Sequence, residues 1–286
     1  MSTFTVRQAT PADAVVAGRI CFEAFHKINT DHNFPPDIPN AEMATGFCEE
    51  LFRHPKFYNV VAEENGRIIG SNCLDERSII SGIGPITIDP AAQNKGVGKA
   101  LMQAVLDRAR EQNAPGVRLV QAAFHNRSLS LYTNLGFAVR EPLTVVSGTT
   151  VVRQIEGCKV RPAEPADLEA CNTLCQKIHG HHRSGELSDG IAQKTAFVVE
   201  HYHRITGYTS VMGFFGHTVG ESNVDVMALI AATPEFHGPG IFIPSRNTEL
   251  FAWCLAQGLR VTQPMTLMSL GLYNEPKGAF LPSVTF

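Results

Sequence analysis

The sequence predicts an α+β protein made of two related halves, each with a central mixed, largely antiparallel β-sheet flanked by helices. The chain has 286 residues, 44% hydrophobic and 18% charged, which is enough apolar material for a sizeable core. One short pattern occurs twice: residues 6–13 read VRQATPAD and residues 160–167 read VRPAEPAD. Stretches with the two-residue period of strands also alternate with stretches of helical period. These observations together favour a duplicated α+β fold.

A second pair of landmarks sets the lengths of the two halves. Residues 126–139 and 246–261 each read as an amphipathic helix that ends at a glycine, Gly136 or Gly258, and continues into a strand. Residue 6 corresponds to residue 160, but Gly136 corresponds to Gly258, so the offset falls from 154 to 122. We therefore predict domains at 1–155 and 156–286, and interpret the shorter second half as having lost one helix with its loops.

The first half can be divided into elements in order. A repeated Pro-Ala-Asp suits a helix start in each half, because proline fixes φ and aspartate accepts from first-turn amides. The pattern then predicts helices over 15–25 and 41–52, strands over 57–63 and 67–74 joined at Asn65-Gly66, a central strand over 83–88, a helix over 97–110, and strands over 117–124 and 150–152. For the second half it predicts a hairpin region over 197–213, a central strand over 224–232, a strand over 241–243 and an ordered strand near the C-terminus.

The stretch most informative about function is residues 86–110, ITIDPAAQNKGVGKALMQAVLDRAR, a strand followed by a glycine-containing loop and a helix. Gly96 and Gly98 lie at the start of the helix, where the first N–H groups lack acceptors and the helix dipole is positive. Such a helix start binds anions, and a pyrophosphate would fit. The alternative is that the two glycines only shape a tight turn.

Two other phosphate-binding loops are excluded by single residues. A Walker loop requires glycine where Gln93 stands and serine or threonine where Ala100 stands. A dinucleotide-binding fingerprint requires glycine where Leu101 stands. ATP and NAD binding are therefore not expected.

The loop and a second segment together resemble the GNAT superfamily of acetyl-CoA-dependent N-acetyltransferases. Gln93-Asn94-Lys95-Gly96-Val97-Gly98 is similar to the family's Gln/Arg-x-x-Gly-x-Gly/Ala loop, and Asn126, Leu131-Tyr132 and Gly136-Phe137 are similar to its second signature. The resemblance covers roughly residues 4–156 and implies an acetyl-CoA site with no metal. The residues it implies for the cofactor are Ile86, Thr87, Ile88, Gln93, Asn94, Lys95, Gly96, Val97, Gly98, Lys99, Asn126 and Tyr132.

Acetylation of an amine needs two proton transfers, and the resemblance implies a residue for one of them. An alkylammonium with a pKa near 10.4 must lose a proton before it attacks, and the departing thiolate must gain one. Tyr132 is expected as the general acid. The family's glutamate on the central strand is missing from residues 83–88, so the base is open: His125, Glu76 and Asp75 are candidates, and a water held near Gly84-Pro85 is an alternative.

Composition excludes other classes of partner. The chain has 24 basic and 27 acidic residues without long runs of either sign, which argues against nucleic-acid or anionic-membrane binding. We expect a cytoplasmic protein with reduced thiols, because no secretory signal or membrane-length apolar run is evident and the seven cysteines are an odd number. Cys171, Cys175 and His179 share a helical face at a spacing that matches no familiar zinc pattern, and are read as core residues.

The second half is expected to lack a cofactor site. After its predicted central strand, residues 233–240 read TPEFHGPG, where Pro239 has no N–H and no long helix follows. A packing, dimerising or substrate-wall role remains, and a homodimer is left open. The activity we predict is acetyl transfer from acetyl-CoA to the primary amine of a small molecule or protein. The alternative is an acyl-CoA-binding regulatory or scaffolding module without transferase activity.

Overall fold

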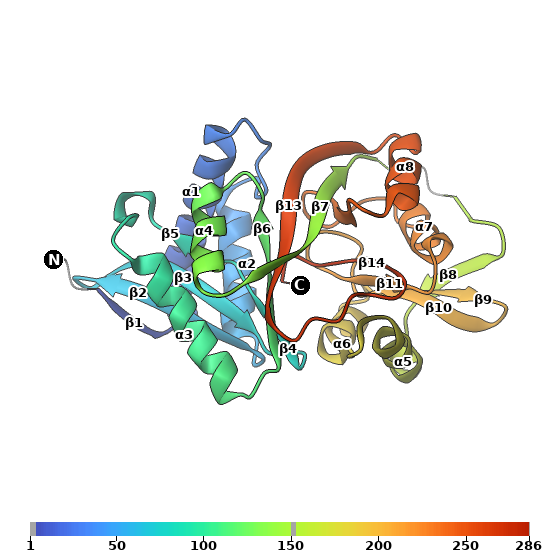
Figure 1. The fold of residues 1–286 in the computed structure, drawn as a ribbon, viewed down its shortest axis with the longest axis horizontal. Coiled ribbons are helices and arrows are strands. Elements are labelled where there is room, and N and C mark those ends of the chain that lie inside the picture. Colours follow the sequence, from blue (N-terminus) through green and yellow to red (C-terminus); the bar gives the residue numbers. More distant parts are fainter. Residues whose placement is uncertain (1–3, 150–152, 286) are drawn as a thin grey trace.

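The computed structural model describes residues 4–149 and 153–285 and shows two halves side by side (Figure 1). The predicted strand over 150–152 lies outside the described residues. The first half consists of β1 (Thr5–Gln8), α1 (Ala14–Asp31), α2 (Ala41–Arg53), β2 (Phe57–Glu64), β3 (Arg67–Asp75), β4 (Ile80–Ile83), β5 (Thr87–Ile88), α3 (Val97–Glu111), β6 (Gly116–Ala122), α4 (Asn126–Asn134) and β7 (Ala138–Ser147).

The first half is a three-layer arrangement with helices on both faces of its sheet. Val61 faces a core cluster formed with α1 and α2, whereas its neighbours Val60 and Ala62 face a cluster formed with α3 and Tyr132. This alternation is what the two-residue period of a strand buried on both faces requires. The hairpin at Asn65-Gly66 forms as predicted, with both residues at positive φ.

The second half contains β8 (Cys158–Pro162), α5 (Leu168–His179), α6 (Ser184–Ala192), β9 (Phe197–His201), β10 (Arg204–Thr209), β11 (Thr218–Gly220), α7 (Asn223–Ala231), β12 (Ile241–Pro244), α8 (Thr248–Ala256), β13 (Arg260–Gly271) and β14 (Ala279–Leu281). Its own sheet has the order β14-β11-β10-β9-β8. The C-terminal strand is ordered as predicted, since β14 pairs with β11.

The repeated Pro-Ala-Asp forms the same helix start in both halves. Asp13 accepts from the backbone N of Thr10 at 2.7 Å and pairs with Arg7, and Asp167 accepts from the backbone N of Glu164 at 2.8 Å and pairs with Arg161. In each case the carboxylate satisfies an amide at the helix entrance while an arginine from the preceding strand neutralises it.

The two halves exchange strands. The larger sheet has the order β1-β2-β3-β4-β6-β13-β7-β12, so β13 of the second half is inserted between β6 and β7 of the first. In turn β12 pairs with β7. β7 and β13 are equivalent elements, since each follows a helix that ends at a glycine, and they lie antiparallel at the junction of the halves (Figure 1). The sequence boundary near residue 155 is therefore not a boundary between two separate sheets.

Three sequence predictions need correction. The strand predicted over 224–232 is helix α7: Ser222 and Asp225 form a capping box, and a run buried on every side has no periodicity that separates helix from strand. The inferred loss of a helix is also wrong, because α7 follows β11 as α3 follows β5. The strand predicted over 83–88 is interrupted between β4 and β5, at Gly84 with φ of 142° and Pro85, which has no N–H.

Part of the missing length of the second half comes from shorter helices and a shorter connection. Helices α5 and α6 have 12 and 9 residues where α1 and α2 have 18 and 13. Only residues 221–222 separate β11 from α7, whereas residues 89–96 separate β5 from α3. The loop that could hold an anion is thus absent from the second half although the helix is present. In the described residues no helix is both long and apolar enough to cross a membrane.

Candidate active site

The site begins where two neighbouring strands of the first half diverge. β4 pairs in parallel with β6 only from Ile80 to Gly82. Beyond that point β5 stays with β3, and β6 stays with β13. A cavity of about 360 Å³ opens between them. It is lined by residues of α1, α3, β6 and α4, and the second half contributes Phe214, Phe215, Met265 and Val284 to its wall.

The N-terminus of α3 forms one end of this cavity. Gly96 is the N-cap with φ of 84°, a conformation that costs glycine nothing. The first backbone hydrogen bond in the helix runs from the Ala100 N to the Gly96 O at 3.1 Å, so Val97, Gly98 and Lys99 have N–H groups without an acceptor inside the helix. A Cβ on Gly98 would lie 3.3 Å from Ile88 Cδ1, which shows how little room the wall leaves there.

Arg127 connects this loop to the start of α4. Its Nη1 donates to Gln93 Oε1 at 3.0 Å and its Nη2 donates to Asn94 Oδ1 at 2.7 Å. The guanidinium therefore lies beside the free N–H groups of α3, and both are suited to a negatively charged group. Sequence reasoning did not single out Arg127, although it directly follows Asn126 of the second signature.

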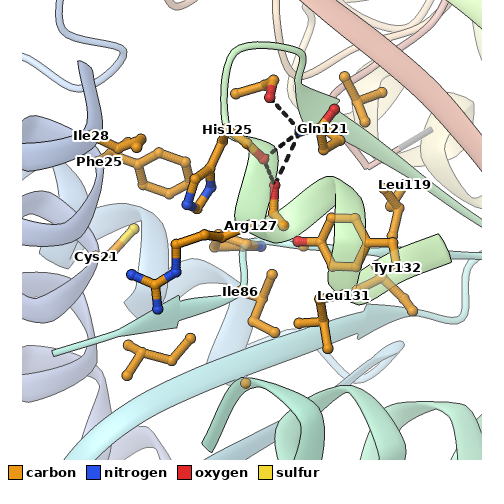
Figure 2. Close-up of a pocket in the computed structure, with 18 of the residues that line it drawn as sticks. Cys21, Phe25, Ile28, Ile86, Leu119, Gln121, His125, Arg127, Leu131 and Tyr132 are labelled. Atoms are coloured by element: carbon orange, nitrogen blue, oxygen red, sulfur yellow. Dashed lines mark hydrogen bonds between the residues drawn. The ribbon is translucent and has the colours of Figure 1, made fainter. Parts of the chain in front are cut away.

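Tyr132 lies in the wall between the cavity and the core. Its ring packs against Phe137 at 6.2 Å between centroids, and only 7% of the residue is exposed. The hydroxyl points from α4 into the cavity (Figure 2) and has no hydrogen-bond partner among residues 4–149 and 153–285. Burial raises the pKa of Tyr132 above that of a free phenol. Tyr132 therefore stays protonated at neutral pH and can donate.

His125 and Gln121 also line the cavity and lie above the Tyr132 hydroxyl in the view of Figure 2. Burial lowers the pKa of His125, and the nearby Arg127 and His32 lower it further, so the ring is neutral near pH 7. Gln121 Nε2 donates to the His125 carbonyl and to Ser128 Oγ, both at 3.1 Å. These bonds fix the turn from which His125 and α4 emerge.

The cavity wall also contains a carboxylate that the sequence did not reveal. Asp37, in the proline-rich loop after α1, lines the cavity and accepts a hydrogen bond from Gln263 Nε2 on β13. The sequence signal was weak, because a single aspartate in a loop has no periodicity and its partner is far away in the chain.

Comparisons with known proteins agree with this geometry. The model of the acetyltransferase (GNAT) family matches residues 22–137. A mycothiol acetyltransferase from Nocardia farcinica (strain IFM 10152) is 39% identical over 64 residues, which are 22% of this chain and 21% of that protein. The chain thus spans about a fifth of the length of that relative. Residues 22–137 form a GNAT acetyltransferase domain.

Solved structures extend the likeness to the whole chain at the level of the fold. A proposed acetyltransferase from Pyrococcus horikoshii has a TM-score of 0.74 at 19% identity, covering 96% of this chain and 94% of that one. A GCN5-related N-acetyltransferase from Sphaerobacter thermophilus has a TM-score of 0.62 at 16% identity, with coverages of 95% and 96%. A tandem GNAT protein from the clavulanic acid biosynthesis pathway has a TM-score of 0.56 at 11% identity, with coverages of 94% and 98%. These likenesses cover both halves of the chain and concern the fold.

Most of the residues expected from the GNAT resemblance come together in the structure. The cavity of the GNAT domain is lined by Ile86, Ile88, Gln93, Asn94, Gly96, Val97, Gly98, Lys99, His125 and Tyr132. Thr87 and Asn126 line an adjoining groove that shares Ile86, Ile88, Gln93 and His125 with the cavity. Lys95 lines neither and pairs with Glu64 at 3.2 Å.

Two of the candidate bases are not brought to the cavity of the GNAT domain. Arg108 Nε lies 2.7 Å from Glu76 Oε1, and the Arg77 guanidinium lies 2.7 Å from Asp75 Oδ2. Neither acid is among the residues that line the cavity, so each has the structural role of an ion-pair partner. Cys171 and Cys175 pack in a hydrophobic cluster with Tyr208, and in the described part of the chain no three His, Cys, Asp or Glu side chains are grouped to hold a metal.

Proposed function

We propose that this protein is an acetyl-CoA-dependent N-acetyltransferase that transfers an acetyl group to a primary amine by direct attack. One observation carries the proposal: the same cavity joins the free N–H groups at the start of α3 to the hydroxyl of Tyr132. A thioester on a phosphorylated carrier requires an anion site for its phosphates and a proton donor for its departing sulfur, and this cavity holds both.

The residues present fit acetyl-CoA. The N–H groups of Val97, Gly98 and Lys99, with Arg127 and Lys99 beside them, would hold the pyrophosphate. Beyond Gly82 the edges of β5 and β6 separate, so backbone N–H and C=O groups on these edges are not paired between the two strands. These groups could form hydrogen bonds with the amides of the pantetheine arm. With a net charge of −3 the chain has no general positive field, so the local amides must do most of this work.

Tyr132 is the residue that we assign to the leaving group. Acetyl-CoA would supply the acetyl group as a thioester: the amine nitrogen forms a bond to the carbonyl carbon, the carbon–sulfur bond breaks, and the sulfur takes a proton. The Tyr132 hydroxyl, buried and protonated, can give that proton, and removal of such a donor typically costs about 100-fold in rate. Its ring is fixed by Phe137, which keeps the hydroxyl directed into the cavity.

The test combines binding and turnover. Calorimetry should show acetyl-CoA binding that weakens when Arg127 is replaced by glutamine, since a guanidinium is removed from the anion site. Arg110→Gln, which changes an exposed arginine on α3 outside the cavity, is the matched control. Release of free thiol should depend on added amine. Binding without any amine-dependent release would overturn the transferase and favour an acyl-CoA-binding module.

A further inference from the structure

Apart from the α3 loop and Arg127, the described residues that line the cavity are mostly apolar, with Asp37 as an acidic side chain and a few neutral polar ones. Its walls include Phe25, Phe47, Phe214, Phe215, Met265 and Val284. Asp37 is the acidic side chain among the described residues that line the cavity. An acceptor that fills this space must therefore present hydrocarbon to most of the wall and something complementary to a carboxylate at one point.

Asp37 differs from several other carboxylates that are shielded from solvent in having no cationic partner within the described residues. Asp75, Glu141 and Glu186 each pair with an arginine. Within residues 4–149 and 153–285, no lysine, arginine or histidine forms an ion pair with Asp37, and Gln263 supplies only a neutral donor. A carboxylate that is shielded from water without a counter-charge is costly, and a bound cation would remove that cost.

Further unpaired polar atoms lie in the same wall. Asn29 is 2% exposed, and its Oδ1 has no hydrogen-bond partner among the described residues. Gln121 is 3% exposed. Its Nε2 donates to the His125 carbonyl and to Ser128 Oγ, whereas its Oε1 has no hydrogen-bond partner among the described residues. Both residues line the cavity with Asp37. Buried oxygens without donors favour a ligand that brings N–H groups, and an ammonium brings three.

We propose that Asp37 is the anchor for the ammonium group of the acceptor, and that the acceptor is a small primary amine carried on an apolar aromatic or branched aliphatic body. This rests on the proposed transferase function and adds the acceptor class. Polyamines, amino sugars and amino acids fit less well, because they carry more charged or hydroxyl groups than Asp37, Asn29 and Gln121 can partner in a wall that is otherwise mostly apolar.

The same carboxylate is placed to take part in the reaction. Burial raises the pKa of Asp37, which brings it closer to that of an amine than an exposed aspartate would be. The balanced sequence is that the ammonium gives one proton to the Asp37 carboxylate and the free amine bonds to the acetyl carbon. The carbon–sulfur bond then breaks as the sulfur takes the proton of Tyr132, and the nitrogen loses its second proton to solvent to give the neutral amide. The proton on Asp37 then returns to Tyr132 through solvent.

The second half is part of this acceptor site. Gln263 on β13 orients Asp37, and Phe215 packs against Phe47 of α2 with ring centroids 5.0 Å apart. The strand exchange that places β13 between β6 and β7 is what brings Met265 to the same wall. The half without a cofactor loop therefore shapes the acceptor end of the cavity in the other half.

The experiment measures kcat/KM for phenethylamine, isoamylamine, spermidine, glucosamine and a peptide with an N-terminal alanine, using wild type and Asp37→Asn. Asparagine keeps the hydrogen bond from Gln263 but lacks the charge. We expect the two apolar amines to have the highest kcat/KM, and Asp37→Asn to raise their KM by roughly 10-fold or more while the KM for acetyl-CoA stays within about twofold. Glu23→Gln, which neutralises an exposed acid on α1 outside the cavity, should change neither KM.

A binding measurement separates this inference from the proposed function. With CoA present, wild type should bind phenethylamine more tightly than phenethyl alcohol, and Asp37→Asn should lose that difference. Without a ligand, Asp37→Asn should melt at the same temperature or about 2 to 4 °C higher, since an uncompensated charge is removed. Turnover with an unchanged amine KM in Asp37→Asn, or a preference for spermidine or glucosamine, overturns the acceptor site alone. Amine-selective binding without turnover overturns the transferase and leaves the ammonium site standing.

Discussion

Tyr132 shows at the level of one residue how the fold prepares a side chain for chemistry. Its position on α4 places the ring against the core, and the opening between β5 and β6 leaves the hydroxyl facing the cavity. A buried phenol that has no partner in the described structure and a raised pKa is held as a proton donor. The core thus sets both the place and the protonation state of the group.

Tyr132→Phe isolates the hydroxyl because the ring packing is kept. We expect kcat to fall about 100-fold with the affinity for acetyl-CoA unchanged, since a proton donor acts in the transition state. Tyr58→Phe is the matched control: Tyr58 lies under Arg108 on β2, outside the cavity, and its change should leave kcat unaltered. Steady-state kinetics at saturating acetyl-CoA decide this. A kcat within twofold of wild type in Tyr132→Phe would remove Tyr132 from the mechanism.

At the scale of elements, the start of α3 can be tested with a pair of glycines. Gly98→Ala places a methyl 3.3 Å from Ile88 Cδ1 and 3.5 Å from Leu131 Cδ2, which the wall tolerates but a bound pyrophosphate would not. We expect the Kd for acetyl-CoA to rise about tenfold or more. Gly46→Ala is the control, since a Cβ there meets nothing within 4 Å in helix α2.

The Gly46→Ala control should stabilise the protein by about 0.5 to 1 kcal/mol, because alanine is the better helix former, and leave the Kd unchanged. Calorimetry gives the Kd and thermal melting gives the stability. If Gly98→Ala binds acetyl-CoA as tightly as the wild type and the control do, Gly98 serves only the turn, and the pyrophosphate site lies elsewhere.

Elements with a local signal could be predicted from the sequence, and those that depend on the rest of the fold could not. The β2–β3 hairpin follows from Asn65-Gly66, and α3 from its stripe of Val97, Leu101 and Val105. Helix α7 is buried on every side, so its apolar run indicated no element type. The insertion of β13 into the first sheet involves pairing across more than a hundred residues, for which one sequence carries no signal.

The same distinction explains what was found of the site. The anion loop and Tyr132 belong to two compact segments whose spacing carried the resemblance, and both line the cavity. Asp37 matters because Gln263 and the phenylalanines of the second half surround it, which only the three-dimensional structure shows. The sequence made Glu76 a candidate base because it directly follows β3. In the structure Glu76 forms an ion pair with Arg108 of α3 and does not line the cavity.

For the whole molecule, a buried polar cluster beside the junction of the halves supports stability. Glu186 is 5% exposed and forms an ion pair with Arg183. Glu186 Oε1 also lies 3.0 Å from His217 Nδ1 and accepts a hydrogen bond from Ser210 Oγ at 2.9 Å. Burial alone would raise the pKa of Glu186, but Arg183, His217 and Arg77 outweigh it and hold the pKa well below the ordinary value. Arg77 reaches this region from the first half and also pairs with Asp189 at 3.0 Å.

Glu186→Gln should lower the free energy of unfolding by about 3 to 5 kcal/mol, because it leaves a buried guanidinium without its counter-charge. The depressed pKa means that Glu186 stabilises the wild type above the pKa of an unfolded glutamate, and that this contribution is lost as pH falls through the folded value. The variant should therefore lose less stability on acidification. Glu221→Gln, at a surface pair with Arg204, is the control and should change stability little. Equal effects of the two changes in urea unfolding would contradict this role.

The strand exchange predicts that the halves do not fold independently. A fragment of residues 1–155 lacks β13, so β6 and β7 lose their shared neighbour and expose two strand edges and the apolar wall beneath. We expect this fragment to aggregate or to unfold without a cooperative transition, and co-expression with residues 156–286 to restore solubility. A soluble 1–155 fragment with a sharp thermal transition would show instead that the first half is a self-sufficient domain.

The central claim is that one cavity binds acetyl-CoA and passes its acetyl group to an amine nitrogen. The most direct measurement uses acetyl-CoA labelled with carbon-13 in the acetyl group and follows amine product and free thiol together by mass spectrometry. We predict labelled amide and CoA in equal amounts with wild type, and at least about tenfold less of both with Tyr132→Phe in the same time. Thiol released without labelled amide, or no release from a protein that binds acetyl-CoA, would contradict the claim.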